Sequence, residues 1–475
     1  MTDTEFVKHV FYGISHGVYN LRMIPFQALP TNPAFALVES IQKTLADFAW
    51  FWLVILLGFV FERILISWRQ NIYLSKNPLV VLEVRIPREI ILGPKAMEQV
   101  LANFNGLANG PGNFYEKYVD GEVPHALSLE IASFEGNIHF YITTPKRHQR
   151  MIEAHLYAQY PDLEIAPVED YVDKMPATIQ EVFSAGYDMM GSELILGEDD
   201  VYPIRSYLEF GSSEDAENLD PISAMIETLA KVNPGEQVWL QIVIRPTTSD
   251  WLKKGKKKIE ELKDKAKVTK VVVRDGVKNE QETMGRLSPG EIETMEGIEK
   301  NIAKPAFETV IRYLYFAPQK AFNVNFGKRA VTSCLNQYKS YSMNFFKGNG
   351  AVSTYAHWAI WPYFFAGTRM GLRKASMLFS YRTRYIKEQP QFRNMMFGRR
   401  TGSKYFIMNI EKLATIYHFP SSTVLTAPFI QRVESRRTGP PAGLPIFSRN
   451  GENTTGFQFG PHDPSGKSDQ PARQE

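Results

Sequence analysis

Residues 79–170 alternate between apolar and polar side chains, and this pattern restricts the fold more than any other part of the 475-residue chain. LVVLEVRI, ALSLEIAS and NIHFYIT each place apolar residues at every second position, which is typical of strands with one buried face. Helical stripes follow Gly93-Pro94 and Thr144-Pro145, and LEIAP is a last short strand. The predicted order is strand–helix–strand–strand–helix–strand, the split βαβ or ferredoxin-like arrangement.

Strand parity also predicts which side chains of this domain are buried. In ALSLEIAS, Leu129 and Ile131 should point into the core, because neighbouring side chains of a strand lie on opposite faces. Ser128 and Glu130 should then face outward. If Glu130 is exposed in this way, its substitution should cost little stability.

A second, looser copy of this order is expected in residues 200–445. Its strands are VYPIRSYLEF, QVWLQIVIRP, FETVIRYLYFAP and KYFIMN, with helices after Asp220-Pro221 and over residues 320–340. A charged insertion, residues 250–302, separates the second and third strands. We expect it to project as a helical hairpin with VTKVVVRDGVKN as the linker. Residues 446–475 are rich in Gly, Asn, Ser and Pro and are expected to be disordered.

The run FAWFWLVILLGFVF, residues 48–61, contains no polar side chain. Lengthened at both ends to residues 41–72, it predicts one transmembrane helix. Its expected interfacial anchors are Trp50, Trp52, Arg63 and Trp68. A buried core helix is the alternative. Residues 1–40 have apolar positions at helical spacing and are interpreted as an amphipathic segment.

Basic residues follow the run closely but hardly precede it. We therefore expect a single-pass protein of the cytoplasmic (inner) membrane whose C-terminal part lies in the cytoplasm. The predicted fold class is α+β, with one N-terminal transmembrane helix followed by two ferredoxin-like (split βαβ) modules. The second module carries the charged helical insertion.

No motif indicates a catalytic, cofactor or metal site. The nine histidines are scattered, and the single Cys334 excludes disulfides within the chain. The acidic trio of residues 198–200 is interpreted as a solvated turn. Gly466-Lys467-Ser468 is similar to the end of a phosphate-binding loop, but Pro461 stands where that motif needs glycine. The sequence therefore predicts a protein that is not an enzyme.

Two basic clusters are candidate contacts with a nucleic acid or a partner protein. The net charge of +3 gives no global attraction to nucleic acid, so such contacts must be local. Arginine among aromatic residues over 369–405 suits phosphates and bases, but it also suits a membrane surface or a protein interface. The simplest interpretation of the lysine run is a solvated helix face. The candidate residues are Lys253, Lys254, Lys256, Lys257, Lys258, Arg373, Lys374, Arg382, Arg384, Arg399 and Arg400.

YRTRY, KYFIMNIEKLATIYHFP, APFIQRVESRRTGPPAGLP and IHFYITTPKRHQRMIEAHLYAQYPDLEI together resemble a known family. It is the membrane-anchored N-terminal region of bacterial type IV secretion and conjugation ATPases of the coupling class, whose front domain has no assigned function. In that family the PP-x-x-LP element leads into a motor domain, whereas this chain continues into a short polar tail. The resemblance therefore implies anchoring, docking and DNA guidance without ATP hydrolysis.

These observations predict a non-enzymatic, membrane-anchored scaffold or docking component of a type IV secretion or conjugative DNA-transfer apparatus. The alternative is a membrane-tethered DNA-binding protein that uses residues 369–405. The expected partners are the membrane, other proteins of the apparatus and a separate motor ATPase. Contact with DNA and assembly into a homo-oligomer are left open.

Overall fold

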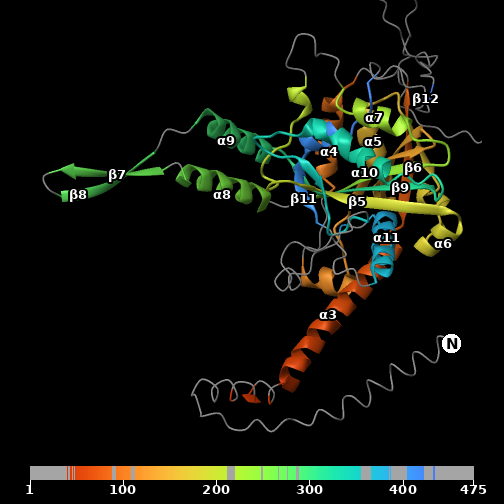
Figure 1. The fold of residues 1–475 in the computed structure, drawn as a ribbon, viewed down its shortest axis with the longest axis horizontal. Helices are drawn as coiled ribbons and strands as arrows, with labels where there is room; N and C mark the ends of the chain where they lie inside the picture. Colours follow the sequence, from red (N-terminus) through yellow and green to blue (C-terminus); the bar gives the residue numbers. More distant parts are fainter. Residues whose placement is uncertain are drawn as a thin grey trace, which may run out of the picture. The chain divides into compact units, whose positions relative to one another are not determined.

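A ten-stranded sheet, to which both halves of the described chain contribute, organises the fold (Figure 1). The computed structural model describes residues 40–433, apart from residues 41–42, 45–46, 48, 88–91, 108–112, 211–219, 248–249, 266, 275–276, 285–287, 355–364, 385, 387–403 and 422–431. Residues 434–475 fall in a separate unit outside the description. Nearly all of the segment predicted to be amphipathic and the whole tail predicted to be disordered therefore lie outside the described residues.

Residues 79–168 form the first half of the sheet. The alternating segments become strands, and the order is β2-β3-β1-β4 with antiparallel neighbours. The elements are β1 (Leu79–Pro87), α4 (Pro94–Asn105), the π-helical turn η1 (Glu116–Asp120), β2 (Leu127–Phe134), β3 (Asn137–Pro145), the turn η2 (Lys146–His148), α5 (Gln149–Gln159) and β4 (Glu164–Val168).

The second half has the strand order β6-β9-β5-β10. Each half therefore arranges its four strands across the sheet in the same way: the second strand in chain order, then the third, the first and the fourth. Its elements are η3 (Tyr171–Lys174), α6 (Ile179–Ser184), β5 (Tyr187–Leu196), η4 (Tyr207–Glu209), α7 (Ser223–Ala230), β6 (Gln237–Pro246), β9 (Ala306–Pro318), α10 (Val324–Cys334), η5 (Leu335–Tyr338) and β10 (Phe346–Gly348).

Two strands of the second half differ from those expected. Residues 201–210 do not form its first strand, because Pro203 offers no backbone N–H and Ser206 begins the turn η4 in a capping box with Glu209. Strand β5 takes that place. KYFIMN does form a strand, β11 (Phe406–Asn409), but it pairs with the start of β9 while β10 completes the order.

The two halves share one sheet. Strands β2 and β6 pair in antiparallel register from Leu127 opposite Ile244 to Phe134 opposite Gln237. Each half would otherwise present an unpaired strand edge, and the two edges satisfy each other. The two predicted ferredoxin-like modules are therefore halves of one continuous sheet, and the prediction of two modules is wrong.

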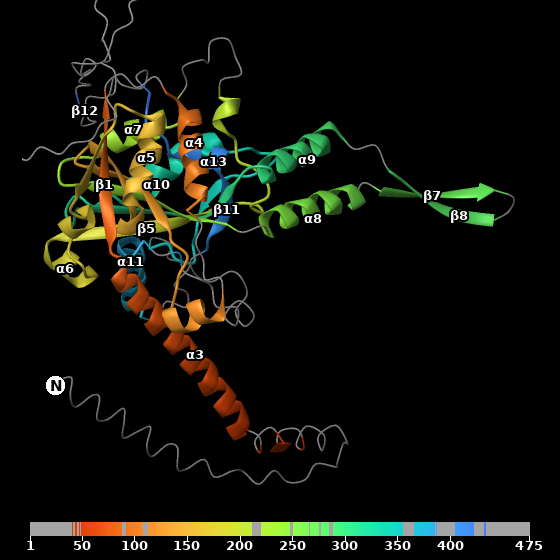
Figure 2. The same cartoon turned by 180° about the vertical axis from the view of Figure 1, so that it is seen from behind.

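Helices cover both faces of this sheet (Figures 1 and 2). On one face, α4, α5, α7, α10 and α13 (Ile410–Ile416) enclose the main apolar core, which includes Leu129 and Ile131 as expected. On the other face, α11 (Ala366–Arg382), η3 and α6 enclose a second apolar cluster. Glu130 points to this second face and is 0% exposed, so the prediction that it faces solvent is wrong.

The charged insertion is an arm that extends from the sheet between β6 and β9 (Figures 1 and 2). We call residues 250–302 the arm. Its two helices are α8 (Asp250–Lys265) and α9 (Pro289–Ile302). Strands β7 (Lys267–Arg274) and β8 (Val277–Met284) pair as a hairpin where a linker was expected. The two-residue strand β12 (Arg432–Val433) pairs with the end of β1.

Helix α3 (Ala49–Lys76) contains residues 49–61 of the run that predicted a membrane span. Within the described residues no helix is both long and apolar enough to cross a membrane, so the prediction of a transmembrane helix is wrong. Residues 48–61 would cover only about 21 Å as a helix, against about 30 Å of hydrocarbon. The polar part of α3 that follows this run contacts the rest of the chain, because Tyr118 donates a hydrogen bond of 3.0 Å to Glu62.

The predicted membrane anchors Trp50, Trp52, Arg63 and Trp68 are therefore residues of α3, a helix that is not long and apolar enough to span a membrane. Trp50 and Trp68 are exposed on this helix. The side chains of Trp52 and Arg63 lie outside those that the structure describes. Further along α3, Tyr73 donates a hydrogen bond of 3.2 Å to Glu122, which holds the C-terminal end of the helix against the folded part of the chain.

Candidate functional site

Six strands each contribute one side chain to a line of polar residues on the face that α11 covers. The backbone register places these residues opposite one another from β1 through β3, β2, β6 and β9 to β5. We call them the polar row: Glu83, Tyr141, Glu130, Gln241, Arg312 and Glu193. All six side chains are buried. Three come from each half of the sheet, so the row crosses the junction between the halves.

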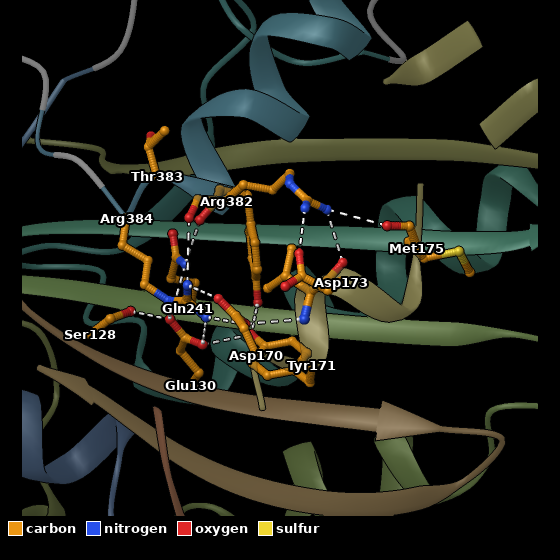
Figure 3. A network of polar contacts seen from close by, with 12 residues as sticks. Ser128, Glu130, Asp170, Tyr171, Asp173, Met175, Gln241, Arg382, Thr383 and Arg384 are labelled. Atoms are coloured by element: carbon orange, nitrogen blue, oxygen red, sulfur yellow. Dashed lines mark hydrogen bonds and ion pairs between the residues drawn. The ribbon is translucent and has the colours of Figure 1, made fainter. Parts of the chain in front are cut away.

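Glu130 lies at the centre of the row, and Figure 3 shows the polar side chains that converge on it. Its carboxylate accepts hydrogen bonds from Ser128 Oγ at 2.5 Å, Tyr171 OH at 2.7 Å and Gln241 Nε2 at 3.1 Å. Arg384 adds Nε at 2.7 Å and Nη2 at 3.2 Å. A buried carboxylate is costly unless a cation and donors satisfy it, and Glu130 has both.

Arg384 reaches the row from the chain that follows α11. Its guanidinium also donates to both oxygens of Asp170, at 2.6 and 2.8 Å, so one cation serves two carboxylates. Burial alone would lower the pKa of Arg384, but the attraction of Glu130 raises it well above its ordinary value. For Asp170, burial works to raise the pKa, and the hydrogen bonds from Arg384 bring it below its ordinary value.

The backbone of Arg384 is strained. Its φ of 50° lies in the left-handed region, which costs a residue other than glycine about 1–3 kcal/mol. The ion pairs with Glu130 and Asp170 supply the compensating interactions. Arg384 therefore fastens the turn after α11 to the centre of the sheet.

The second half of the row contains a closed ion pair. Arg312 Nε lies 2.9 Å from Glu193 Oε1, and the side chains are 0% and 2% exposed. Arg312 Nη1 also donates to the backbone oxygen of Ser380 in α11, at 3.3 Å. Removing one member of such a buried pair typically costs about 3–5 kcal/mol, because the other charge is left uncompensated.

The first half of the row ends closer to solvent. Glu83 Oε1 lies 2.8 Å from His139 Nδ1, and Glu83 Oε2 accepts a hydrogen bond of 3.0 Å from Arg85. The side chain of Arg85 is 37% exposed. It also pairs with Glu164 at 3.1 Å. The charge at this end of the row is therefore shared with the surface.

The chemistry of the row is that of a fastening between α11 and the sheet. The hydroxyls of Tyr171 and Tyr381 lie 2.8 Å apart, and burial raises the pKa of both phenols well above the ordinary value, so they stay neutral. The side chains of Tyr171, Tyr381 and Glu130 are all buried. Within the described residues, no group of three or more His, Cys, Asp or Glu side chains is arranged to hold a metal ion.

The matched family model covers most of this arrangement. A family described as a domain of unknown function (DUF8128) matches residues 84–343, which is more than half of the chain. The chain belongs to this family. No curated protein matches the chain. The DUF8128 segment includes the arm and all of the polar row except Glu83, whereas α11 and Arg384 follow it. The segment thus contains Glu130 and Asp170, and the chain beyond it supplies their cation.

The basic residues of segment 369–405 that the structure describes make contacts within the chain. Arg382 donates to the backbone oxygens of Val172 and Met175, at 3.0 and 3.2 Å, and pairs with Asp173 at 2.5 Å. Lys374 pairs with Asp188 at 2.5 Å. Arg373 donates to the backbone oxygens of residues 350 and 353. With Arg384 they hold α11 in place. Arg399 and Arg400 lie outside the described residues.

The lysines of the other cluster are distributed around α8. Lys254 pairs with Asp199 at 2.8 Å and also with Asp200, at the base of the arm. Lys258 pairs with Glu261 at 3.3 Å. Lys253, Lys256 and Lys257 are exposed. The acidic residues 199 and 200, which sequence reasoning interpreted as a solvated turn, are therefore paired with a lysine of the arm.

Sequence reasoning missed the polar row, although a signal for it was present. The strands LSLEIAS, GSELIL, QVWLQIVI and TVIRYLYF each have one Glu, Gln or Arg near the middle, at the position opposite in parity to the core. An isolated charge within an apolar strand has two interpretations, a solvated face or a buried partner. Four such strands with both signs of charge favour the second, because the charges can pair across strands.

Proposed function

We propose that this chain is a non-enzymatic scaffold and that its arm is a docking element for another protein of an assembly. The observation that carries the proposal is the position of the arm. It interrupts a pair of adjacent strands, β6 and β9, whose register runs to Pro246 opposite Phe307. A two-residue turn can join such strands, so the inserted residues 250–302 are not needed for the sheet. Their place outside the sheet supports a role in recognition.

The base of the arm is rigidly packed, which suits an element that must hold a partner in a defined position. Trp251, Ile298 and Ile302 of the arm form an apolar cluster with Val201 and Ala306, which lie outside the arm and which we assign to the body, meaning the chain outside residues 250–302. At Gly255 the two arm helices approach closely, since a Cβ there would lie 2.4 Å from the side chain of Ile302. The base is therefore packed like a protein interior.

Polar contacts fix the direction of the arm as well. Asn301 Nδ2 donates to the backbone oxygen of Val201 at 2.9 Å, and Asn409 Nδ2 donates to the backbone oxygen of Asn301 at 3.1 Å. The ion pair between Lys254 and Asp199 adds a charged contact on the other helix. Both α8 and α9 are thus fastened to the body.

The exposed charges differ between the two arm helices. On α8 they are mainly basic, and on α9 mainly acidic. Opposite charges on neighbouring helices favour one orientation of a complementary partner and repel others. On α8 the exposed basic residues are Lys253, Lys254, Lys256, Lys257 and Lys263, against the exposed acidic Glu260, Glu261 and Asp264. On α9 the exposed acidic residues are Glu291, Glu293, Glu296 and Glu299, against the exposed Lys300.

The kind of assembly that we propose rests on the sequence resemblance. We propose a type IV secretion or conjugative DNA-transfer apparatus, in which a separately encoded motor ATPase is one of the partners. Docking is better supported than DNA binding, because Arg373, Arg382 and Arg384 donate hydrogen bonds to oxygen atoms of this chain. Location at the cytoplasmic membrane and assembly into a homo-oligomer stay predictions.

Site-specific photo-crosslinking in the native cell tests this proposal. A photoreactive residue is placed at Lys257 on α8 or Glu293 on α9, and a matched one at Lys231, an exposed lysine after α7. We expect discrete adducts with a secretion-apparatus protein from the two arm positions and none of these from position 231. Equal adducts from all three positions would contradict docking by the arm, and adducts with proteins unrelated to secretion would contradict the assembly.

A deletion variant completes the experiment. Replacing residues 250–302 by a short glycine-rich turn should leave β6 and β9 paired, because the two strands pair with each other right up to the insertion, where Pro246 lies opposite Phe307. We expect the variant to fold with an intact sheet and to lose co-purification with the crosslinked partner. Retention of the partner by a folded deletion variant would move the docking site away from the arm.

A further inference from the structure

A cavity of about 280 Å³ lies next to the polar row, where α11 ends and no longer covers the sheet. Its floor is the sheet face that bears Ser128 and Thr143, which are cross-strand neighbours. Its walls are the C-terminal end of α3, the segment of residues 123–126, and residues 383, 384 and 386. Ser128, Thr383 and Arg384 appear together on one side of the network in Figure 3.

Apolar side chains make up most of the cavity wall. They are Leu74, Pro78, Leu79, Val123, Pro124, Ala126, Pro145 and Ile386. A concave, mainly apolar site with a few polar groups at one end is the usual form of a small-molecule site, and this volume is near the lower limit for such sites.

The charged groups around the cavity are already neutralised. Arg384 is held between Glu130 and Asp170, and Arg245 pairs with Glu308 through a hydrogen bond of 2.6 Å. No carboxylate occurs among the described residues that line the cavity. Burial and the nearby Arg147 charge lower the pKa of His125 to about 4, so this imidazole is neutral at neutral pH. An ion would therefore lose its hydration without gaining an opposite free charge.

One polar group of the floor has no hydrogen-bond partner. Thr143 is 1% exposed, and its Oγ1 makes no hydrogen bond within the described residues. The neighbouring Ser128 differs, because it donates its hydroxyl to Glu130. A buried hydroxyl without a partner costs free energy, and a ligand that offers a donor or acceptor would recover that cost.

We propose that this cavity binds a small uncharged molecule with a largely apolar body and one hydrogen-bonding group, which pairs with Thr143. The apolar body contacts Leu79, Val123 and Ala126, and the polar group lies against the sheet. The site is separate from the arm, so it is independent of the docking function.

Two matched fluorescent probes test the chemical class on the full chain. N-phenylnaphthylamine is uncharged and has one N–H group, and anilinonaphthalene sulfonate has the same ring system with an added negative charge. We expect the uncharged probe to saturate at one per chain and to bind at least about tenfold more tightly than the sulfonate, because a buried ion costs more. Tighter binding of the sulfonate, or binding without saturation, would overturn the proposal.

Substitutions locate the bound probe. Ala126→Phe fills the cavity and should abolish saturable binding, whereas Thr143→Val keeps the shape and should weaken it about fivefold through the lost hydrogen bond. Phe61→Ser, on the exposed surface of α3, is the control for probe adsorbed to that helix and should leave the affinity unchanged.

The outcomes decide the proposal even if Ala126→Phe fails to fold. An unchanged affinity in Thr143→Val would then overturn the assigned site. So would a folded Ala126→Phe variant that keeps one saturable probe, or loss of the saturable probe in Phe61→Ser. A fivefold loss confined to Thr143→Val would support the pairing of the ligand with this hydroxyl.

Discussion

The two halves of the sheet have the same strand order but close the polar row differently. In the first half, Glu83 shares its charge with Arg85, whose side chain is 37% exposed. In the second half, Glu193 is sealed against Arg312 with almost no exposed surface. The same backbone arrangement thus accommodates a solvated end and a dry end. The difference shows that strand topology does not determine the electrostatics of a face, which depend on what covers it.

The equivalent hairpins of the two halves differ as much. Strands β2 and β3 are joined by a tight turn in which Glu135 and Gly136 both have positive φ, as the twist of a hairpin requires. Strands β6 and β9 are joined by the arm. An insertion is tolerated there because the register of the flanking strands is set by their own pairing. The second half therefore has the more deeply buried end of the polar row and also carries the arm.

The largest expected effect is at the sealed end of the row. Arg312→Met should lower the free energy of unfolding by about 3–5 kcal/mol, because Glu193 loses its cation. Tyr141→Phe, at the equivalent position of the first half, should cost at most about 1 kcal/mol. Denaturant unfolding of the full chain measures both. Adding Glu193→Gln to Arg312→Met should recover more than half of the loss, and equal costs of the two single variants would abolish the contrast between the halves.

The centre of the row should be intermediate. Glu130→Gln removes the charge that faces Arg384 but leaves Asp170, so we expect a loss of about 2–3 kcal/mol. Glu164→Gln is the matched control, because Glu164 pairs with Arg85 at the surface, and it should change the stability by less than about 0.5 kcal/mol. Thermal and denaturant unfolding compare the two. A tolerant Glu130 would mean that α11 does not cover this face in solution.

The arm base tests the second contrast. Gly255→Ala forces a Cβ against Ile302, and overpacking of this kind costs about 1–3 kcal/mol. Gly290→Ala, with open space around the new Cβ, should stay within about 0.5 kcal/mol of the parent chain. Hydrogen exchange should be faster in α8 and α9 of the first variant and unchanged in the sheet. Faster exchange throughout would show that the arm and the sheet unfold as one unit.

The smallest effect is a pH dependence of the first half. Burial, with Arg147 and His148 nearby, lowers the pKa of His125 to about 4, whereas the unfolded chain has the ordinary value of 6.5. The unfolded state therefore binds more protons between these values, and stability falls as the pH drops from about 6.5 to 4. Melting temperatures at pH 7 and pH 5 measure this slope, which His125→Asn should reduce.

The second half should resist acid further. Burial would raise the pKa of Asp220, but hydrogen bonding to His418 lowers it to about 2. The stabilisation that this carboxylate provides is present above its ordinary pKa and is lost only as the pH falls towards 2. If hydrogen exchange at pH 5 is faster around Asp220 than around His125, the assigned order of acid sensitivity is wrong.

The sequence by itself determined the local features of this protein. Alternation in residues 79–168 places the strands, and it assigns Leu129 and Ile131 to the core. The charged composition of residues 250–302 identified an insertion with two helices. These features follow from contacts between residues that are near in sequence, since strand parity and helix periodicity are properties of the backbone. The uncharged run of α3 shows the limit of this reasoning, because its apolar composition predicted a membrane span, whereas no helix of the described residues is long and apolar enough to form one.

Only the tertiary structure decided what the second face of each strand contacts. Parity shows that Glu130 is opposite in direction to Leu129, but whether that direction leads to water depends on distant segments. Glu130 is paired with Arg384, which is 254 residues away along the chain, and Gln241 with the backbone of Tyr381, which is 140 residues away. A charge in water and a charge in a buried pair are both satisfied, so they leave the same local pattern in a sequence. The folded chain distinguishes them because α11 excludes solvent from that face and brings the compensating charge.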